Sequence, residues 1–457
     1  MNSEEAFLIV DAEFFAKTGK RLNNVQRAIL LGSFERQPYR KIADRFGYAH
    51  SYLLQDAGPT LWNSLSDVFG EPVNKSNYWS VVVHRSPIVQ PPPPDAPPGS
   101  SPEVGLSFPQ SSPTPHDWGT ALDASTFYGR DEELKRLKDS ILWDGCRLLT
   151  VFGIAGSGKT LLSVKLAQQM MDDFEVEVVV WRSLKNGEFS KRPPSLRELC
   201  DDLIQVLSEK LGTRIESFFD YLANYHCLIV LDGWETVLRS GVYDGSYQVG
   251  YEDYADFLQH AGSVAKLQSC VLITSQEKPK EVADMEMEIR QVCSWELKGL
   301  EEDAGSNFFE SGNRLSNSSG LLGSLMRRCD GNPRLLRRIA TTIRQDFGGD
   351  IARFLESIQQ DSLWGIYDLL KGQFDRLSEA EVAVIKVIYQ LTNNGEPANL
   401  TNILRDVTLP VPKWRLREAV LPSLLRRSLI EVKFERYYLR DLVMEYAITQ
   451  LTGGDFL

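Results

Sequence analysis

The stretch RLLTVFGIAGSGKT, residues 147–160, decides the fold of this chain. Its apolar first half predicts a buried strand, which leads directly into a loop of the pattern GxxxxGK followed by Ser or Thr, at residues 153–160. Glycines let successive backbone N–H groups turn toward phosphate oxygens, and the start of the helix behind them favours an anion. Strand, loop and helix together predict a phosphate site.

The residue types in this loop indicate separate roles at a nucleotide. Lys159 would place its ammonium on the β and γ phosphates, and the hydroxyl of Thr160 would bind Mg²⁺. The backbone positions expected to hold the phosphates are Gly153, Gly156, Ser157 and Gly158.

A second metal ligand is expected about 70 residues further on. The apolar run LIVL is followed by Asp232, whose carboxylate would hold the metal together with Thr160. We therefore assign Lys159 and Asp232 to the chemistry at the phosphates. Glu235 would either orient water or, as we favour, be a surface carboxylate at a helix start.

The segments around the loop alternate between strand and helix patterns, which favours a parallel sheet covered by helices on both faces. Five β segments are expected, at 147–154, 176–184, 226–234, 269–276 and 289–300. After about residue 300 helical patterns dominate, and from about residue 377 helices and a short two-stranded element suit a winged helix.

The predicted fold class is multidomain, α/β and α: a P-loop parallel-sheet domain, a helical lid and a winged-helix domain, preceded by a small helix-turn-helix-like module. The proline- and serine-rich run that starts at residue 86 predicts a linker. The expected parts are the module at 1–85, the linker at 86–120, the nucleotide-binding domain at 121–299, the helical domain at 300–372 and the winged helix at 373–457.

Composition narrows the setting. With 42% hydrophobic and 25% charged residues the chain is globular, and it has neither an apolar run of membrane-spanning length nor a secretory signal, so we expect a cytoplasmic protein without a membrane role. The six cysteines are scattered along the chain, and we expect them to be reduced thiols in the core. The five histidines pair with no cysteine or carboxylate at metal-ligand spacing, so a zinc site is improbable. A net charge of −12 disfavours a broad nucleic-acid-coating role.

Several ordered motifs resemble the NB-ARC branch of the STAND class of signal-transducing ATPases, which includes apoptotic protease-activating factor and plant resistance proteins. FYGRDEELKRL at 127–137 resembles the hhGRE segment, CDGNPRLLRRIA at 329–340 the GLPLA segment, and LRDLVMEYA at 439–447 the MHD segment. The likeness covers about residues 121–457.

This resemblance implies further site residues. Tyr128, Gly129 and Arg130 would lie against adenine and ribose, and Pro333 would pack on the nucleotide. Arg440, in place of the histidine of the MHD segment, would reach the β phosphate of ADP and hold the resting state closed.

Two departures from the family pattern bear on hydrolysis. Gln276 stands where the family usually has an arginine that touches the γ phosphate, and Gly233 stands where many members have a second acid. We therefore expect at most a slow ATPase that switches by nucleotide exchange. Arg182 is a candidate substitute, although pairing at the surface is favoured for this strand-end arginine.

The N-terminal module shows a helix, a shorter helix that ends in glycine and a third helix, an order that resembles a helix-turn-helix. Its recognition helix would begin at Ala49, His50, Ser51 and Tyr52. Since the module has about ten basic and nine acidic residues, we favour a protein-interaction role over DNA binding. A basic cluster lies at Arg327, Arg328, Arg334, Arg337, Arg338 and Arg344; it would face nucleic acid, a neighbouring protomer or, as favoured, solvent.

These observations predict an ATP- or ADP-dependent signalling switch with Mg²⁺ that changes conformation and self-associates when ATP is bound. The alternative is a nucleotide-regulated DNA-binding regulator acting through the helix-turn-helix. Bacterial NB-ARC proteins similar to this one usually continue into sensor repeats, which this sequence lacks. These repeats would be lost, truncated or supplied by a partner, and in the last case we expect a sensor or effector protein as a further partner.

Overall fold

The computed structural model describes residues 3–35, 37–75, 77, 78, 81, 114–124, 127–173, 175–185, 192–264, 268–307, 309, 321–358, 365–409 and 411–452. The chain divides into two compact units, which we treat separately: residues 1–116 with 168–179, and residues 117–167 with 180–457. Most of the expected linker, up to residue 113, lies outside the described residues.

The N-terminal module is helical. In chain order its helices are α1 (Ser3–Thr18), α2 (Asn24–Phe34), α3 (Tyr39–Phe46), α4 (His50–Tyr52), the π-helical turn η1 (Leu53–Ala57) and α5 (Gly58–Phe69). A capping box between Asn23 and Gln26 begins α2, and Gly47 ends α3 in the left-handed conformation. The helix, shorter helix ending in glycine and third helix expected from the sequence are present, packed around a common apolar core.

A six-stranded sheet in the order β1–β3–β4–β5–β2–β6 forms the centre of the following part. Its strands are β1 (His116–Asp117), β2 (Leu148–Phe152), β3 (Val178–Ser183), β4 (Cys227–Asp232), β5 (Cys270–Ser275) and β6 (Val292–Glu296). Strand β5 pairs in parallel with β2 and β4, and β2 pairs in parallel with β6. The five expected strands are all present, and β1 is an additional strand within the range expected to be linker.

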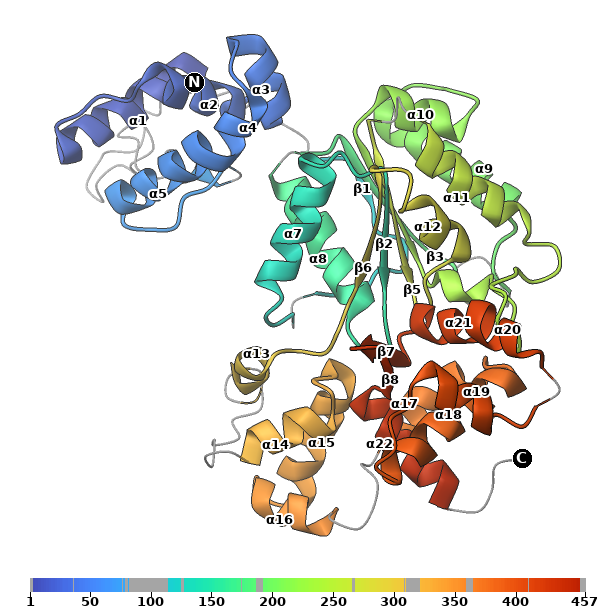
Figure 1. Cartoon of the computed structure of the whole chain (residues 1–457). Coiled ribbons are helices and arrows are strands. Elements are labelled where there is room, and N and C mark those ends of the chain that lie inside the picture. The colour runs from blue at the N-terminus through green and yellow to red at the C-terminus, as the bar shows by residue number, and fades with distance from the viewer. Residues whose placement is uncertain are drawn as a thin grey trace. The chain divides into compact units, whose positions relative to one another are not determined.

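Helices lie on both sides of the sheet, with α7 and α8 on one face and α9 to α12 on the other (Figure 1). Their bounds are α7 (Asp131–Leu142), α8 (Lys159–Asp172), α9 (Leu196–Leu211), α10 (Phe218–Asn224), η3 (Trp234–Thr236), α11 (Asp253–Ser263) and α12 (Lys280–Met285). Since every residue of β2, β4 and β5 is buried, these strands read in the sequence as continuous apolar runs. With the glycine loop between β2 and α8, this is the fold of P-loop ATPases.

The rest of the chain is mainly helical. Its elements are α13 (Glu302–Asn307), α14 (Leu321–Arg328), α15 (Pro333–Asp346), α16 (Ile351–Ser357), α17 (Ile366–Phe374), α18 (Glu379–Asn393), α19 (Leu400–Asp406), α20 (Lys413–Arg415), η5 (Leu416–Val420), α21 (Leu421–Arg426), β7 (Ile430–Lys433), β8 (Arg436–Leu439) and α22 (Asp441–Thr452). The antiparallel hairpin β7–β8 follows α18 to α21, which is the order expected for a winged helix. The boundary expected between residues 372 and 373 falls inside α17.

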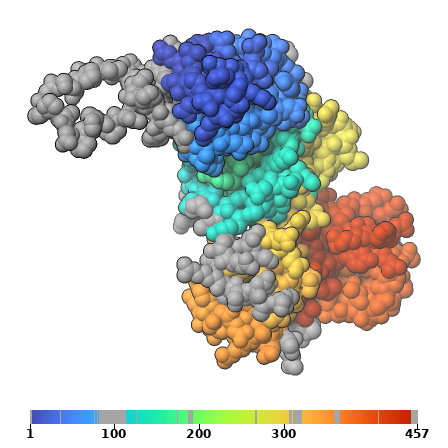
Figure 2. Space-filling view, turned by 90° about the vertical axis from the view of Figure 1, so that its left-hand side faces the viewer, coloured from blue at the N-terminus to red at the C-terminus, as the bar shows by residue number. Residues whose placement is uncertain are grey.

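The glycine loop and the C-terminal helices share one hydrophobic core. The side chains of Ile154 and Ala155 are buried in the same cluster as residues of α14 to α18, α21 and α22. Figure 2 shows the yellow segment after β6 beside the orange helices and the red C-terminal part. Since full burial of one aliphatic side chain stabilises by roughly 1.5–3 kcal/mol, loop and helices are energetically coupled.

Candidate functional site

The glycines of the phosphate loop allow both its turns and the close approach of other segments. Gly153 has φ 151°, and a Cβ there would lie 2.6 Å from the carbonyl oxygen of Leu297. Gly156 has φ 78°, and a Cβ there would lie 2.7 Å from Oδ1 of Asn332 and from Leu369. A larger residue at either position would therefore push neighbouring chain away from the loop.

Lys159 is folded back onto its own loop. Its Nζ donates to the carbonyl oxygens of Gly153 and Ile154, at 2.8 and 2.9 Å, and lies 3.4 Å from Oγ of Ser157. The side chain is buried, and burial lowers the pKa of Lys159 to about 8. This ammonium is held by neutral carbonyls within the loop, so an incoming phosphate would offer it a stronger, charge-assisted bond.

The two expected metal ligands are in direct contact. Oγ1 of Thr160 donates to Oδ1 of Asp232 at 2.7 Å, and the hydroxyl of Thr274 on β5 donates to the same oxygen at 2.6 Å. Asp232 is only 4% exposed. The sheet order places β5 between the strands that end at the loop and at Asp232, which brings the two ligands together at the carboxyl edge.

Lys185, just after β3, was not singled out in the sequence. Its Nζ lies 2.8 Å from Oδ2 of Asp232. Burial lowers the pKa of Lys185, but the charges of Asp232 and Glu235 raise it by more, and the net shift is upward. The carboxylate of Asp232 therefore faces an ammonium on the side that its hydroxyl partners leave open.

The residues fit a magnesium nucleotide. The donor set is a hydroxyl and a carboxylate, which are oxygen ligands of the kind that Mg²⁺ takes together with water and substrate phosphates. Lys159 has no anionic partner among its hydrogen bonds within the described chain, so its ammonium can exchange neutral acceptors for a phosphate. Among the described residues no cluster of three His, Cys or acidic side chains could hold a metal by itself.

The expectation for Glu235 as a surface carboxylate is wrong. Glu235 is 6% exposed, and its Oε2 accepts the backbone N–H of Gln276 at 3.2 Å. The side-chain oxygen of Gln276 is buried without a hydrogen-bond partner among the described residues. Since η3 begins directly behind the sheet edge, its first turn points inward, which the local sequence did not reveal.

Three residues outside the sheet domain bond to the phosphate loop. The Asn332 amide donates to the carbonyl oxygen of Ala155 at 2.8 Å. The backbone N–H of Arg334 donates to the carbonyl oxygen of Gly156 at 3.4 Å. The side-chain oxygen of Gln373 accepts the backbone N–H of Ala155 at 3.1 Å. Pro333 lies beside Gly158, so α15 begins next to the loop.

A buried ionic cluster joins the end of β5 to the C-terminal part. Arg427 lies 2.8 Å from Glu277 and 2.9 Å from Glu381, and Arg376 also pairs with Glu277 at 2.7 Å. The Gln373 amide donates to the carbonyl oxygen of Arg427 at 2.9 Å. The cluster thus extends from the residue after Gln276 to the helices that cover the loop.

Arg440 does not contact the phosphate loop among the interactions of the described residues. It pairs with Glu296 at the end of β6, and its side chain is 9% exposed. Its Nε has no hydrogen-bond partner within the described chain. The predicted bond to a β phosphate would therefore require Arg440 to leave Glu296.

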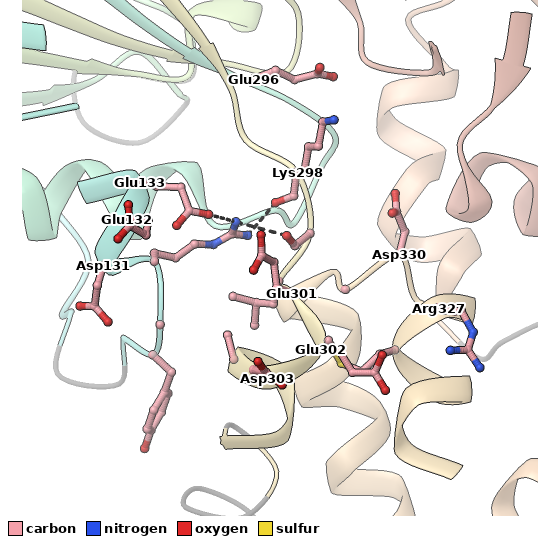
Figure 3. Close-up of a pocket in the computed structure, with 18 of the residues that line it drawn as sticks. Asp131, Glu132, Glu133, Glu296, Lys298, Glu301, Glu302, Asp303, Arg327 and Asp330 are labelled. Atoms are coloured by element: carbon pink, nitrogen blue, oxygen red, sulfur yellow. Dashed lines mark hydrogen bonds and ion pairs between the residues drawn. The ribbon is translucent and has the colours of Figure 1, made fainter. Parts of the chain in front are cut away.

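Arg130 connects the hhGRE-like segment to the loop. Its guanidinium donates to the carbonyl oxygens of Lys298 at 2.6 Å, Gly299 at 3.2 Å and Ser157 at 3.3 Å, and pairs with Glu133 at 2.7 Å. Figure 3 shows the bonds to Lys298, Gly299 and Glu133 beside a cavity of about 840 Å³. The cavity is lined by Tyr128, Gly129 and Arg130, but not by residues 153–160.

This cavity is acidic. Nine carboxylates and four cationic side chains line it, and most of the acids lie at the starts of α7 and α13 or just after α14 (Figure 3). Such a surface repels phosphate but offers acceptors to hydroxyl and amino groups.

Asp330, on the wall of this cavity, gives a pH-dependent prediction. Burial raises the pKa of Asp330 to about 6; Arg440 opposes the shift, and Asp441 and Glu431 add to it. The stability that its neutral form contributes is complete below about pH 4 and is lost as the pH rises through about 6. Asp330→Asn should therefore stabilise the protein by roughly 1–3 kcal/mol at pH 7.5 and by only about a third as much at pH 4.5, measured by urea unfolding.

The control is Asp201→Asn, since the side chain of Asp201 is 71% exposed. It should change stability by less than about 0.5 kcal/mol at both pH values. An equal gain from Asp330→Asn at both pH values would show that the charge of Asp330 is not the cause.

Other basic residues are already engaged. Arg182 pairs with Asp202 at 2.5 Å and Asp117 at 3.0 Å, as favoured from the sequence, although its own side chain is 6% exposed rather than at the surface. In the arginine cluster, Arg328 pairs with Glu445 and Arg338 with Asp368. Arg182 is therefore paired with carboxylates rather than placed at a phosphate, and the ion pairs of Arg328 and Arg338 reduce the net positive charge of the arginine cluster.

The helix-turn-helix module neutralises much of its own charge. Arg21 pairs with Asp11, Arg27 with Glu4 and Arg45 with Glu35. At the start of the expected recognition helix, burial lowers the pKa of His50, and Arg40 and Lys75 lower it further. Ser51 and Tyr52 are exposed, but they bring no positive charge for DNA phosphates.

Comparison with known proteins covers both parts of the chain. Residues 1–85 match the family model described as the vWA-MoxR associated protein N-terminal HTH. An uncharacterized WD repeat-containing protein, alr2800 of Nostoc sp., is 38% identical over 358 residues, which are 75% of this chain and 28% of that protein. The chain therefore spans about 28% of the length of its curated relative.

Solved structures of similar organisation include two archaeal proteins. The Walker-type ATPase paby2304 of Pyrococcus abyssi is 16% identical, with a TM-score of 0.49, over 70% of this chain and 95% of that one. The STAND protein with a tetratricopeptide repeat sensor PH0952 from Pyrococcus horikoshii is 18% identical, with a TM-score of 0.35. The match covers 72% of this chain and 43% of that one.

The class follows from the chain's own geometry. A parallel sheet with helices on both faces, the glycine loop between β2 and α8, and Asp232 beside Thr160 define a P-loop NTPase fold. It is joined to an N-terminal helix-turn-helix module of the kind found in vWA-MoxR associated proteins. None of the described helices is long and apolar enough to cross a bilayer.

Proposed function

We propose that this chain is an adenine-nucleotide-dependent signalling switch. The observation that carries the proposal is the direct bonding of Asn332, Arg334 and Gln373 to the backbone of the phosphate loop. Because Ile154 and Ala155 also lie in the core of the C-terminal helices, the loop cannot change shape without disturbing that packing. Nucleotide state and helix position are thereby coupled.

The bound group would be Mg-ATP or Mg-ADP. Lys159 would exchange the carbonyls of its own loop for phosphate oxygens, and Thr160 and Asp232 would hold Mg²⁺, which neutralises phosphate charge. Tyr128, Gly129 and the acidic cavity would take the nucleoside, because carboxylates accept hydrogen bonds from ribose hydroxyls and the adenine amino group. Pro333 would cover the site from α15.

Hydrolysis is proposed to be slow. Gln276 brings no positive charge to a γ phosphate, and Glu235, the nearest additional acid in the sequence, is held by the backbone N–H of Gln276. A steady-state phosphate-release assay should give turnover on the order of 10⁻³ s⁻¹ or slower, as for other P-loop sites without a transition-state cation. Exchange of ADP for ATP would then do the switching.

Arg440 is proposed as the group that holds the ADP state closed. It is buried, it lies at the start of α22, and one of its guanidinium nitrogens lacks a partner within the described chain. A phosphate would replace Glu296 as its anionic partner. Release of Arg440 on exchange would free α22 and the hairpin, and expose surface through which copies of the chain self-associate.

The test is the nucleotide content of the protein as purified. We expect adenine nucleotide to copurify, measured by absorbance after denaturation and identified by anion-exchange chromatography. Protein without bound nucleotide that also fails to bind added ADP would overturn the proposal.

A nucleotide-regulated DNA-binding role is the second candidate, favoured by the helix-turn-helix family match of residues 1–85. The paired arginines of that module argue instead for a protein partner. Titration of the full chain with duplex DNA at several salt concentrations separates the two. Salt-sensitive binding in one nucleotide state would support the DNA role, and its absence in every state would exclude it.

A sensor is the proposed source of the signal. The curated relative is named for WD repeats, and this chain spans 28% of it. A repeat-bearing region, in the same polypeptide or in a partner protein, would fit a switch that itself contains P-loop, helical and hairpin elements.

A further inference from the structure

Both carboxylate oxygens of Asp232 have hydrogen-bond or ion-pair partners within the chain. Oδ1 accepts the hydroxyls of Thr160 and Thr274, and Oδ2 faces Nζ of Lys185 at 2.8 Å. Asp232 is buried, whereas the side chain of Lys185 is 45% exposed. A half-exposed cation therefore neutralises a buried acid.

The residue next to Asp232 makes room for this lysine. Gly233 has φ 89°, and a Cβ there would lie 2.7 Å from both Cγ and Cε of Lys185. Any side chain at position 233 would therefore displace the stem of Lys185 from its present path. The glycine that removes a second acid from the site is the same glycine that lets a lysine lie across it.

We propose that Lys185 is a built-in competitor of Mg²⁺ for Asp232. The inference rests on the proposed nucleotide site, and it concerns how that site responds to the divalent cation. With Lys185 on Asp232 the carboxylate is neutralised without metal, so a nucleotide phosphate entering the loop meets little repulsion. Mg²⁺ can use Asp232 fully only after the ammonium has moved away, which its exposed four-carbon stem permits.

Two opposite consequences follow when the charge is removed. In Lys185→Met, Asp232 stays uncompensated without metal, so ADP should bind about fivefold more weakly in EDTA. Mg²⁺ no longer competes with an ammonium, so its apparent affinity for the ADP complex should rise about fivefold. The metal-free ADP affinity cancels in the ratio of ADP affinities with and without Mg²⁺, so this ratio should grow about fivefold.

The experiment titrates the full chain, freed of nucleotide, with a fluorescent ADP analogue in EDTA and at a series of Mg²⁺ concentrations. Lys185→Arg, which keeps the charge, should stay near wild type. Lys210→Met removes an exposed charge at the end of α9, away from Lys185, and should also leave the ratio of ADP affinities with and without Mg²⁺ unchanged. Circular dichroism and thermal unfolding establish that each variant is folded.

A second variant reaches the same contact from the other side. Gly233→Asn tolerates the left-handed backbone but places a Cβ against Lys185. It should raise the Mg²⁺ dependence as Lys185→Met does, and the double variant should show no further change. An Mg²⁺ dependence equal to wild type in both single variants would overturn the inference.

Failure of the inference is distinguishable from failure of the proposed function. If wild type binds the ADP analogue and Lys159→Ala does not, the nucleotide site stands, and only the role of Lys185 is in question. If wild type binds no analogue under any condition, the nucleotide site itself is wrong.

Discussion

Lys159→Ala should lower the affinity for ADP by more than about 100-fold, because a buried ammonium that bonds two phosphate oxygens contributes roughly 1.5–3 kcal/mol per bond. The structure already holds this ammonium inside the loop, at the carbonyls of Gly153 and Ile154, so little ordering remains to be done on binding. Isothermal titration of nucleotide-free protein with ADP and Mg²⁺ measures the effect directly.

The matched control is Lys165→Ala, which lies further along α8 and outside the loop. It should change ADP affinity less than about threefold. Loss of affinity in the control as great as in Lys159→Ala would point to a general charge or folding effect. Full affinity in Lys159→Ala would rule out the loop as the phosphate site.

Arg427→Met should destabilise the protein by about 3–5 kcal/mol, because it leaves Glu277 and Glu381 buried without their shared cation. Arg427 is 3% exposed and Glu381 is fully buried, so water cannot replace the guanidinium. Urea unfolding monitored by tryptophan fluorescence measures the loss. The double variant Arg427→Met with Glu381→Gln should recover about 1–2 kcal/mol, since one unpaired charge is removed.

Arg405→Met serves as its control. Arg405 also bridges two carboxylates, Glu396 and Asp406, but its side chain is 57% exposed. Its loss should lower stability far less than the loss of Arg427, because water replaces the guanidinium at an exposed pair. Equal costs for the two arginines would mean that the cluster at Arg427 is no more important than a surface pair, and would remove the ionic link between the end of β5 and the C-terminal helices.

The parts of the site that depend on short stretches of chain could be predicted from the sequence. The glycine loop is a local arrangement of strand, turns and helix start, so its pattern alone placed Lys159 and Thr160. Asp232 is the last residue of a fully buried strand, and the apolar run before it marks the carboxyl edge of the sheet. The five main strands were visible for the same reason.

The parts that depend on contacts between distant segments were not predicted. Lys185 and Asp232 are separated by 47 residues and Gln373 and Ala155 by 218, and no local pattern announces either contact. Strand β1 has two residues and no apolar alternation, so it had no signal. The burial of Glu235 and the pairing of Arg440 with Glu296 likewise depend on how the elements pack.

Lys185 changes how the Gly233 departure is understood. From the sequence, Gly233 signified only the loss of an acid. In the structure the side chain of Lys185, whose ammonium neutralises Asp232, lies against Gly233. Weak hydrolysis and altered dependence on Mg²⁺ would then share one structural cause, the exchange of an acid for a lysine at the metal edge of the site.

The most direct test of the switch is the mass of the purified particle in solution, measured by light scattering after gel filtration, with ADP and with a non-hydrolysable ATP analogue. We expect a compact monomer with ADP and a larger, defined assembly with the ATP analogue, and Lys159→Ala should not respond to either nucleotide. One and the same mass in both nucleotide states, in protein shown to bind both, would contradict the account.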